Sequence, residues 1–192
     1  MDLTSILTQL ATSGVLTKAS LSHDIPADKL TSVLMQVAPA ILSQLGQNAK
    51  DPIAAQSLNS ALDQHDGSIL GSLDTLLSPA QETDGGKIIE HIFGNKKGEV
   101  VQNIAQKSNI DSAHVLKVLA FLAPLIMGYL GSQKKELGTD QSGLESLVKG
   151  ASSQIDMSSL ANDLMKSMLN NGSVKDAVVN AGISALKRKL FG

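Results

Sequence analysis

The sequence has very few of the side chains that carry redox, metal and stacking chemistry. Its 192 residues include no cysteine and no tryptophan, and only four are aromatic, namely Phe93, Phe121, Tyr129 and Phe191. A chain without cysteine forms no disulfide, no thiolate nucleophile and no zinc–cysteine site. So few aromatic rings also disfavour a platform on which nucleic-acid bases could stack.

Charge is equally scarce. Only 18% of the residues are charged, 16 basic residues stand against 18 acidic ones, and Arg188 is the single arginine. This balance excludes a polyelectrolyte tail and a strongly basic surface for nucleic acid. A surface this neutral has little charge to keep helix faces of different copies apart, so it favours self-association.

We expect no targeting segment. No basic residue comes before Lys18, and threonine and glutamine interrupt the apolar residues of the N-terminus, which is not typical of a secretory signal. The most apolar run, residues 118–131, is short and contains Pro124, so it indicates a buried core helix rather than a membrane span. We expect a cytoplasmic protein without integral membrane insertion.

Apolar residues recur at helical spacing along the chain, and strict alternation is almost absent, so the sequence predicts an all-α protein. Asp51-Pro52 predicts a helix start with proline in the first turn. Asp66-Gly67 and Asp84-Gly85 each join a capping carboxylate to a flexible glycine, so both predict helix starts.

Residues 21–46 repeat as residues 106–131, eighty-five positions later, with identities at apolar, proline and glycine positions. Each copy predicts a core helix kinked by a proline, Pro39 or Pro124, and stopped in a left-handed cap by Gly46 or Gly131. We expect a duplicated helical core over residues 1–136, with units of about 1–50 and 84–136 and a helical connector over 51–83. A C-terminal helical extension over 137–192 follows.

Each unit also carries a helix-turn-helix-like pattern, in residues 16–35 and 101–120, with Asn109 where a residue tolerant of positive φ is needed. A homeodomain-like unit could bind DNA through its second helix. The leading residues of these helices are poor in the arginine, lysine, asparagine and glutamine that contact bases and phosphates, however, and each helix runs into an apolar stretch. DNA binding is therefore the second choice.

Four motifs resemble one bacterial family. They read VAPAIL…LG from residue 37, ALDQHDGSIL from residue 61, DGGKIIEHIFG from residue 84 and LAPLIMG from residue 122. Their order is similar to that of the bacterial domain-of-unknown-function 937 family, which includes YidB-like proteins. The resemblance implies an all-helical protein with homeodomain-like relatives and no assigned activity. Residues 137–192 depart from the glycine-rich tails of many relatives.

Two motif histidines, His65 and His91, are candidate metal ligands or catalytic groups, together with the carboxylates Asp63, Asp66, Asp84 and Glu90. No two histidines have the i, i+4 spacing of a helical metal site, and no nucleophile–base pair or glycine-rich phosphate loop is present. We therefore expect no enzyme, metal or cofactor. Asp66 and Asp84 are expected to cap helices, and His91 lies in a last helical turn before Gly94. His23 and His114 are expected on solvated helix surfaces.

The chain ends in a predicted amphipathic helix that begins near Ser173 and carries Lys187, Arg188 and Lys189 in its last turn. These cations suit the helix dipole, a partner or peripheral contact with an anionic membrane. Taken together, the sequence favours a non-enzymatic, self-associating structural or scaffold protein of the bacterial cytoplasm whose main partner is itself. The alternative is a nucleoid-type DNA-associated protein.

Overall fold

A computed structural model describes residues 3–155, 158 and 162, and every regular element in this part of the chain is helical. The all-α prediction is confirmed there. The helices are α1 (Leu3–Thr12), α2 (Val15–His23), α3 (Ala27–Asn48), α4 (Pro52–Gln64), α5 (Pro79–Phe93), α6 (Lys97–Ser108), α7 (Ser112–Leu137) and α8 (Leu144–Gln154). Short 3₁₀ turns cover Ser68–Gly71, Leu73–Leu77, Gly94–Lys96 and Gln141–Gly143.

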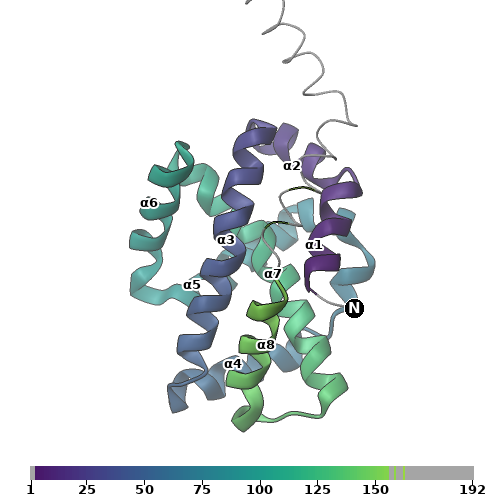
Figure 1. Cartoon of the computed structure of the whole chain (residues 1–192), viewed down its shortest axis with the longest axis vertical. Coiled ribbons are helices and arrows are strands. Elements are labelled where there is room, and N and C mark those ends of the chain that lie inside the picture. The colour runs from purple at the N-terminus through teal and green to yellow at the C-terminus, as the bar shows by residue number, and fades with distance from the viewer. Residues whose placement is uncertain (1–2, 156–157, 159–161, 163–192) are drawn as a thin grey trace, which may run out of the picture.

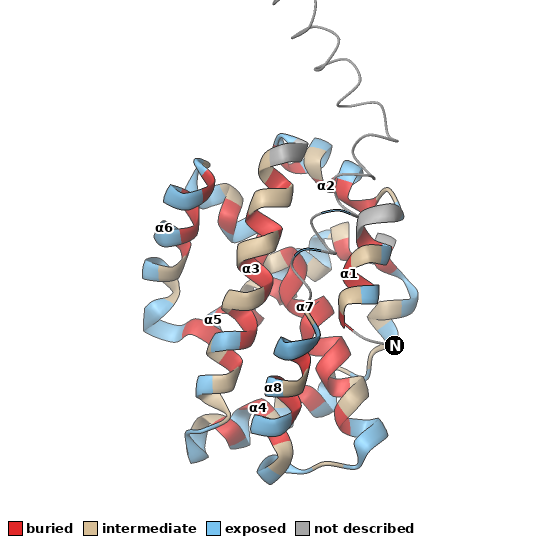
Figure 2. Cartoon of the chain, in the orientation of Figure 1, coloured by how far each residue is buried: buried red, intermediate tan, exposed pale blue. Residues whose placement is uncertain are grey.

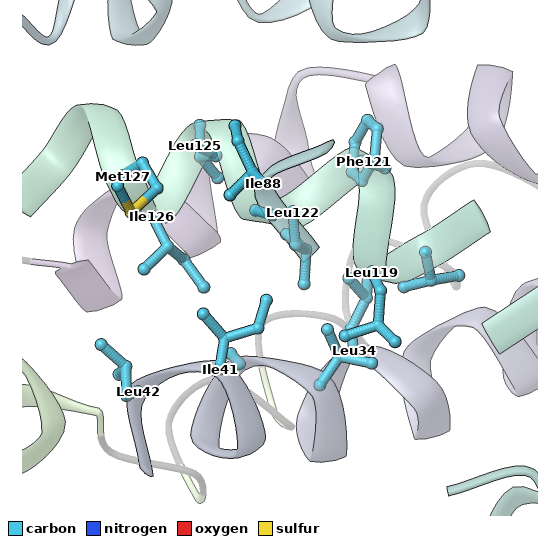
Figure 3. Close-up of a cluster of buried hydrophobic side chains, with 14 of the residues drawn as sticks. Leu34, Ile41, Leu42, Ile88, Leu119, Phe121, Leu122, Leu125, Ile126 and Met127 are labelled. Carbon is cyan, nitrogen blue, oxygen red and sulfur yellow. The ribbon is translucent and has the colours of Figure 1, made fainter. Parts of the chain in front are cut away.

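The core forms where α3 and α7 face one another and α5 packs across α7 (Figure 1). Figure 3 shows Leu34 and Ile41 of α3 directed toward Leu119 and Leu122 of α7, with Ile88 of α5 beside Leu122. These side chains are buried. Each large aliphatic side chain that is removed from water contributes roughly 1.5–3 kcal/mol, so this apolar layer is the main source of stability.

Helix α7 is long and apolar enough to cross a bilayer by length and composition, but 78% of its most apolar window is buried inside the bundle. That burial agrees with the predicted core helix. Pro124 lies inside α7 and Pro39 inside α3, and both helices continue through their prolines. Proline removes one backbone donor. The packing of both helices on other helices offsets that loss.

Two predicted helix ends are confirmed. Helix α4 begins at Pro52, and the carboxylate Oδ1 of Asp51 accepts the backbone N–H groups of Ile53 at 3.1 Å and Ala54 at 2.9 Å. Helix α5 ends at Phe93, and the following Gly94 has φ 50° and donates its N–H to the carbonyl oxygen of Glu90. Both ends thus follow from local chemistry, a capping carboxylate and a glycine at positive φ.

The predicted start at Asp84 is wrong. Helix α5 begins earlier, at Pro79, where the Ser78 hydroxyl accepts the N–H of Gln81, so Asp84 and Gly85 lie inside the helix. A Cβ at position 85 would overlap the carbonyl oxygen of Ala120 and come within 2.7 Å of its carbonyl carbon. Gly85 therefore serves close packing of α5 on α7, which sequence spacing alone does not distinguish from a flexible turn.

The left-handed caps predicted at Gly46 and Gly131 are also wrong. Helix α3 continues to Asn48 and α7 to Leu137, and the left-handed residue that ends α7 is Gly138, with φ 61°. Gly46 instead lies inside α3, where a Cβ would meet Val148 of α8 at 3.8 Å. Each helix still makes tertiary contacts beyond its glycine: the Asn48 side chain of α3 donates to the carbonyl oxygen of Ile92 at 2.9 Å, and Lys134 of α7 is buried.

Residues 144–151 share the core of the preceding helices. Leu144, Val148 and Ala151 of α8 are buried in one continuous cluster that begins at Leu3. Figure 2 shows the buried residues where the helices face one another and the exposed residues on their outer sides. The amide oxygen of Gln154 accepts hydrogen bonds from the Leu3 N–H at 3.2 Å and from the Tyr129 hydroxyl at 2.5 Å. Helix α8 of the predicted extension therefore packs into the same core as the helices before residue 136. Lys187, Arg188 and Lys189 lie outside the described residues.

Candidate functional site

The turn formed by His65, Asp66 and Gly67 follows α4 and is held by local hydrogen bonds. His65 Nδ1 lies 2.7 Å from the carbonyl oxygen of Ala61, which can only accept, so Nδ1 is the donor. Asp66 Oδ1 accepts the N–H of Ser68 at 2.9 Å, as the capping prediction required. Hydrogen bonds from the Ser68 backbone and side chain also hold the pKa of Asp66 below its usual value.

This turn lies against a small-residue face of α7. Gly67 has φ 87°, and a Cβ there would lie 2.8 Å from the Cβ of Ser132. A Cβ at Gly131 would come within 2.6 Å of the Leu62 carbonyl oxygen, and one at Gly128 within 2.7 Å of Ile69 Cγ2. The glycines of two separate sequence motifs are therefore needed for one contact between the turn and α7.

The other motif residues are only partly brought to this turn. Asp84 Oδ2 lies 3.9 Å from His65 Nε2, beyond hydrogen-bond distance. His91 is exposed in the last turn of α5, two helical turns from Asp84 and next to Gly94. Over the described residues, no three histidine, aspartate or glutamate side chains are arranged to hold a metal ion.

Lys134 is a buried lysine that the sequence does not predict. Lys134 of α7 is 6% exposed, pairs with the carboxylate of Asp63 and donates to the carbonyl oxygen of Asn59 at 3.3 Å. Its aliphatic stem lies within the bundle while its charge meets two oxygens of α4. No spacing rule marks such a residue, because Lys134 and Asp63 are distant in sequence.

The prediction that His23 and His114 are solvated is wrong. His23, the last residue of α2, is buried, and its Nε2 lies 3.4 Å from Glu82 Oε1 of α5. His114, in the first turn of α7, is half-buried, and its Nδ1 makes no hydrogen bond. The two rings share this region with Lys117. Burial lowers the pKa of His23 from its usual 6.5; Glu82 opposes that shift, and Lys117 and His114 add to it.

We expect acid to destabilise the protein through His23. Because the folded state lowers the pKa of His23, the unfolded chain takes up a proton more readily. The contribution of neutral His23 to the free energy of unfolding is therefore fully present above about pH 6.5. It is lost as the pH falls from there through the lowered pKa. Urea unfolding, monitored by circular dichroism, should show that the free energy of unfolding declines with falling pH. For this one proton the slope is at most about 1.4 kcal/mol per pH unit.

The His23→Gln variant should flatten this dependence between pH 7.5 and 5, whereas His91→Gln should retain it because His91 is exposed. Equal pH slopes in wild type and His23→Gln would show that another group carries the effect.

A hollow of about 300 Å³ opens at the surface between α5 and α7, beside this histidine region. Its floor is formed by Gly86, Ile89 and Ala120, and Leu116 stands at its edge, 37% exposed. Four charged side chains line its rim, namely Glu82, Glu90, Lys97 and Lys117. We call this hollow the α5–α7 groove. An apolar floor with a mixed-charge rim is the composition of a protein-contact surface.

The described part of the chain is thus a helical bundle. Glycines from its motifs allow the turn that carries His65 to pack closely on α7. The chain is a member of the DUF937 family: the family described as "Bacterial protein of unknown function (DUF937)" matches residues 5–133. The match confirms the resemblance and extends it to α1 and α2. Neither the curated proteins nor the solved structures that were searched gave a match.

Proposed function

We propose that this protein is a non-enzymatic, self-associating structural protein of the bacterial cytoplasm. The observation that carries the proposal is the α5–α7 groove, whose apolar floor is open on a chain with a net charge of only −2. Weak net charge leaves little repulsion between copies, and burial of an apolar face supplies the attraction. Leu21 of α2 and Leu137 of α7 are also exposed.

We also propose that the core arose by duplication of a helix-turn-helix unit. Asp24 between α2 and α3 and Asn109 between α6 and α7 have φ 54° and 49°, and they lie eighty-five positions apart, as the two copies require. The same shift relates the turn hydrogen bond from Ile25 to Ser20, at 2.9 Å, to that from Ile110 to Ala105, at 3.1 Å.

Reciprocal contacts between the two hairpins support this duplication. Ser108, the last residue of α6, accepts a hydrogen bond from Lys29 in the first turn of α3 at 3.3 Å. The corresponding positions are His23 at the end of α2 and His114 in the first turn of α7, and His114 is near enough to add to the lowering of the pKa of His23. The end of each hairpin's first helix thus lies near the start of the other hairpin's second helix, as in a two-fold pair.

The helix-turn-helix arrangement keeps DNA binding as the second candidate function. The exposed residues that lead into α7 include Asp111, Ser112 and Ala113, which offer an acid and no base-reading donor, and Lys29 of α3 is engaged by Ser108. Counterion release would also be small for a chain with one arginine. Self-association is therefore the better-supported function.

Light scattering on the untagged full-length chain tests the proposal. Over a hundredfold concentration range, the mass should rise above the 20.0 kDa of one copy and persist when salt is raised, because apolar burial is not screened. A mass of one copy throughout would refute self-association. The DNA alternative predicts instead a gel shift with duplex DNA that disappears as salt rises.

A further inference from the structure

We propose that two copies of this chain pair across the α5–α7 groove about a two-fold axis, with Leu116 of each copy seated in the groove of the other. The inference rests on the proposed self-association and names its surface. In a two-fold contact the same patch serves both partners, so it must carry both a projection and a hollow, and both signs of charge. The α5–α7 groove meets each of these requirements.

The projection is next to the hollow. Leu116 lies at the edge of the groove and is partly exposed, while the floor beside it is built from Gly86, Ile89 and Ala120. No side chain stands over Gly86, since a Cβ there would meet nothing within 4 Å. A leucine side chain from a second copy therefore finds an apolar floor without a substituent in its way, and each contact buries two leucines.

The rim charges complement those of a second copy. Lys97 already pairs with Glu90 within one copy. Lys117, by contrast, has no ion-pair partner among the described residues, and Glu82 faces only the buried ring of His23 at 3.4 Å. The lowered pKa of His23 keeps that ring neutral at neutral pH, so Glu82 has no charged ion-pair partner among the described residues of its own copy. One unbalanced acid and one unbalanced base on the same rim match each other across a two-fold axis.

Sedimentation equilibrium on full-length variants tests this pairing. Leu116→Glu should weaken association at least tenfold, since it places a charge on the apolar floor of the partner. Leu116→Ala should weaken it less. Ile53→Glu is the matched control, because Ile53 is 80% exposed on α4, away from the groove. The Ile53→Glu variant should self-associate with the same affinity as wild type. Circular dichroism verifies that each variant is folded.

Charge reversal tests the two-fold geometry independently. Lys117→Glu and Glu82→Lys, each alone, bring like charges together twice in the pair and should weaken association severalfold. The double variant Lys117→Glu/Glu82→Lys restores opposite charges across the axis and should recover most of the affinity.

Two results would overturn the pairing, and they differ from each other. If wild type associates but the Leu116 and charge variants do so equally well, the contact lies elsewhere and self-association stands. If wild type sediments as one copy, both the pairing and the proposed function fail.

Discussion

Replacement of Gly131 by alanine is expected to lower the free energy of unfolding by about 3 kcal/mol, the upper end of the usual cost of overpacking a core. The new Cβ would lie 2.6 Å from the carbonyl oxygen of Leu62 and would overlap that of His65. Both are backbone atoms at the end of α4, so they cannot turn aside as a flexible side chain could. The turn that carries His65 would have to separate from α7.

Gly150→Ala is the matched control, because Gly150 also lies inside a helix and a Cβ there would meet nothing within 4 Å. That variant should gain up to about 1 kcal/mol from the better helix propensity of alanine. Urea unfolding, monitored by circular dichroism at 222 nm, measures the free energy of unfolding of both variants. A Gly131→Ala variant as stable as wild type would show that the turn does not depend on this close approach.

Leu122→Ala is expected to cost about 3 kcal/mol as well, within the range for a leucine removed from a closed core. Leu122 of α7 is fully buried, and Figure 3 shows it near Ile41 of α3 and Ile88 of α5. The cavity that alanine would leave therefore has packed walls on several sides. Leu137→Ala, on the same helix at a 66% exposed position, should change stability by less than about 0.5 kcal/mol. Thermal and urea unfolding should agree, and equal losses for the two variants would contradict this assignment of the core.

The histidine turn shows what local reasoning can and cannot find. The capping role of Asp66 was predictable, because a carboxylate two residues before a free N–H is a local arrangement. The contact of this turn with α7 was not predictable. Gly67 and Gly131 are far apart in sequence, and they come close only when α4 lies on α7. For the same reason His23 was misplaced: Glu82, Lys117 and His114 come from other helices.

What the sequence by itself determined is the all-helical class of the protein and several helix ends. Helical spacing depends on neighbours three and four residues apart, and the caps at Asp51 and Gly94 depend on even closer ones, so both can be read along the chain. The resemblance to the DUF937 family rests on the order of four such local motifs, and the family match over residues 5–133 confirms it.

Only the tertiary structure decided which glycines are packing sites and which polar groups are buried. Gly85 and Gly131 look like helix breakers in sequence, yet each lies inside a helix against the backbone of another. Lys134 and His23 look solvated, yet they lie beneath neighbouring helices. The free energy of such contacts depends on groups from distant parts of the chain, and folding brings them together only when the helices pack.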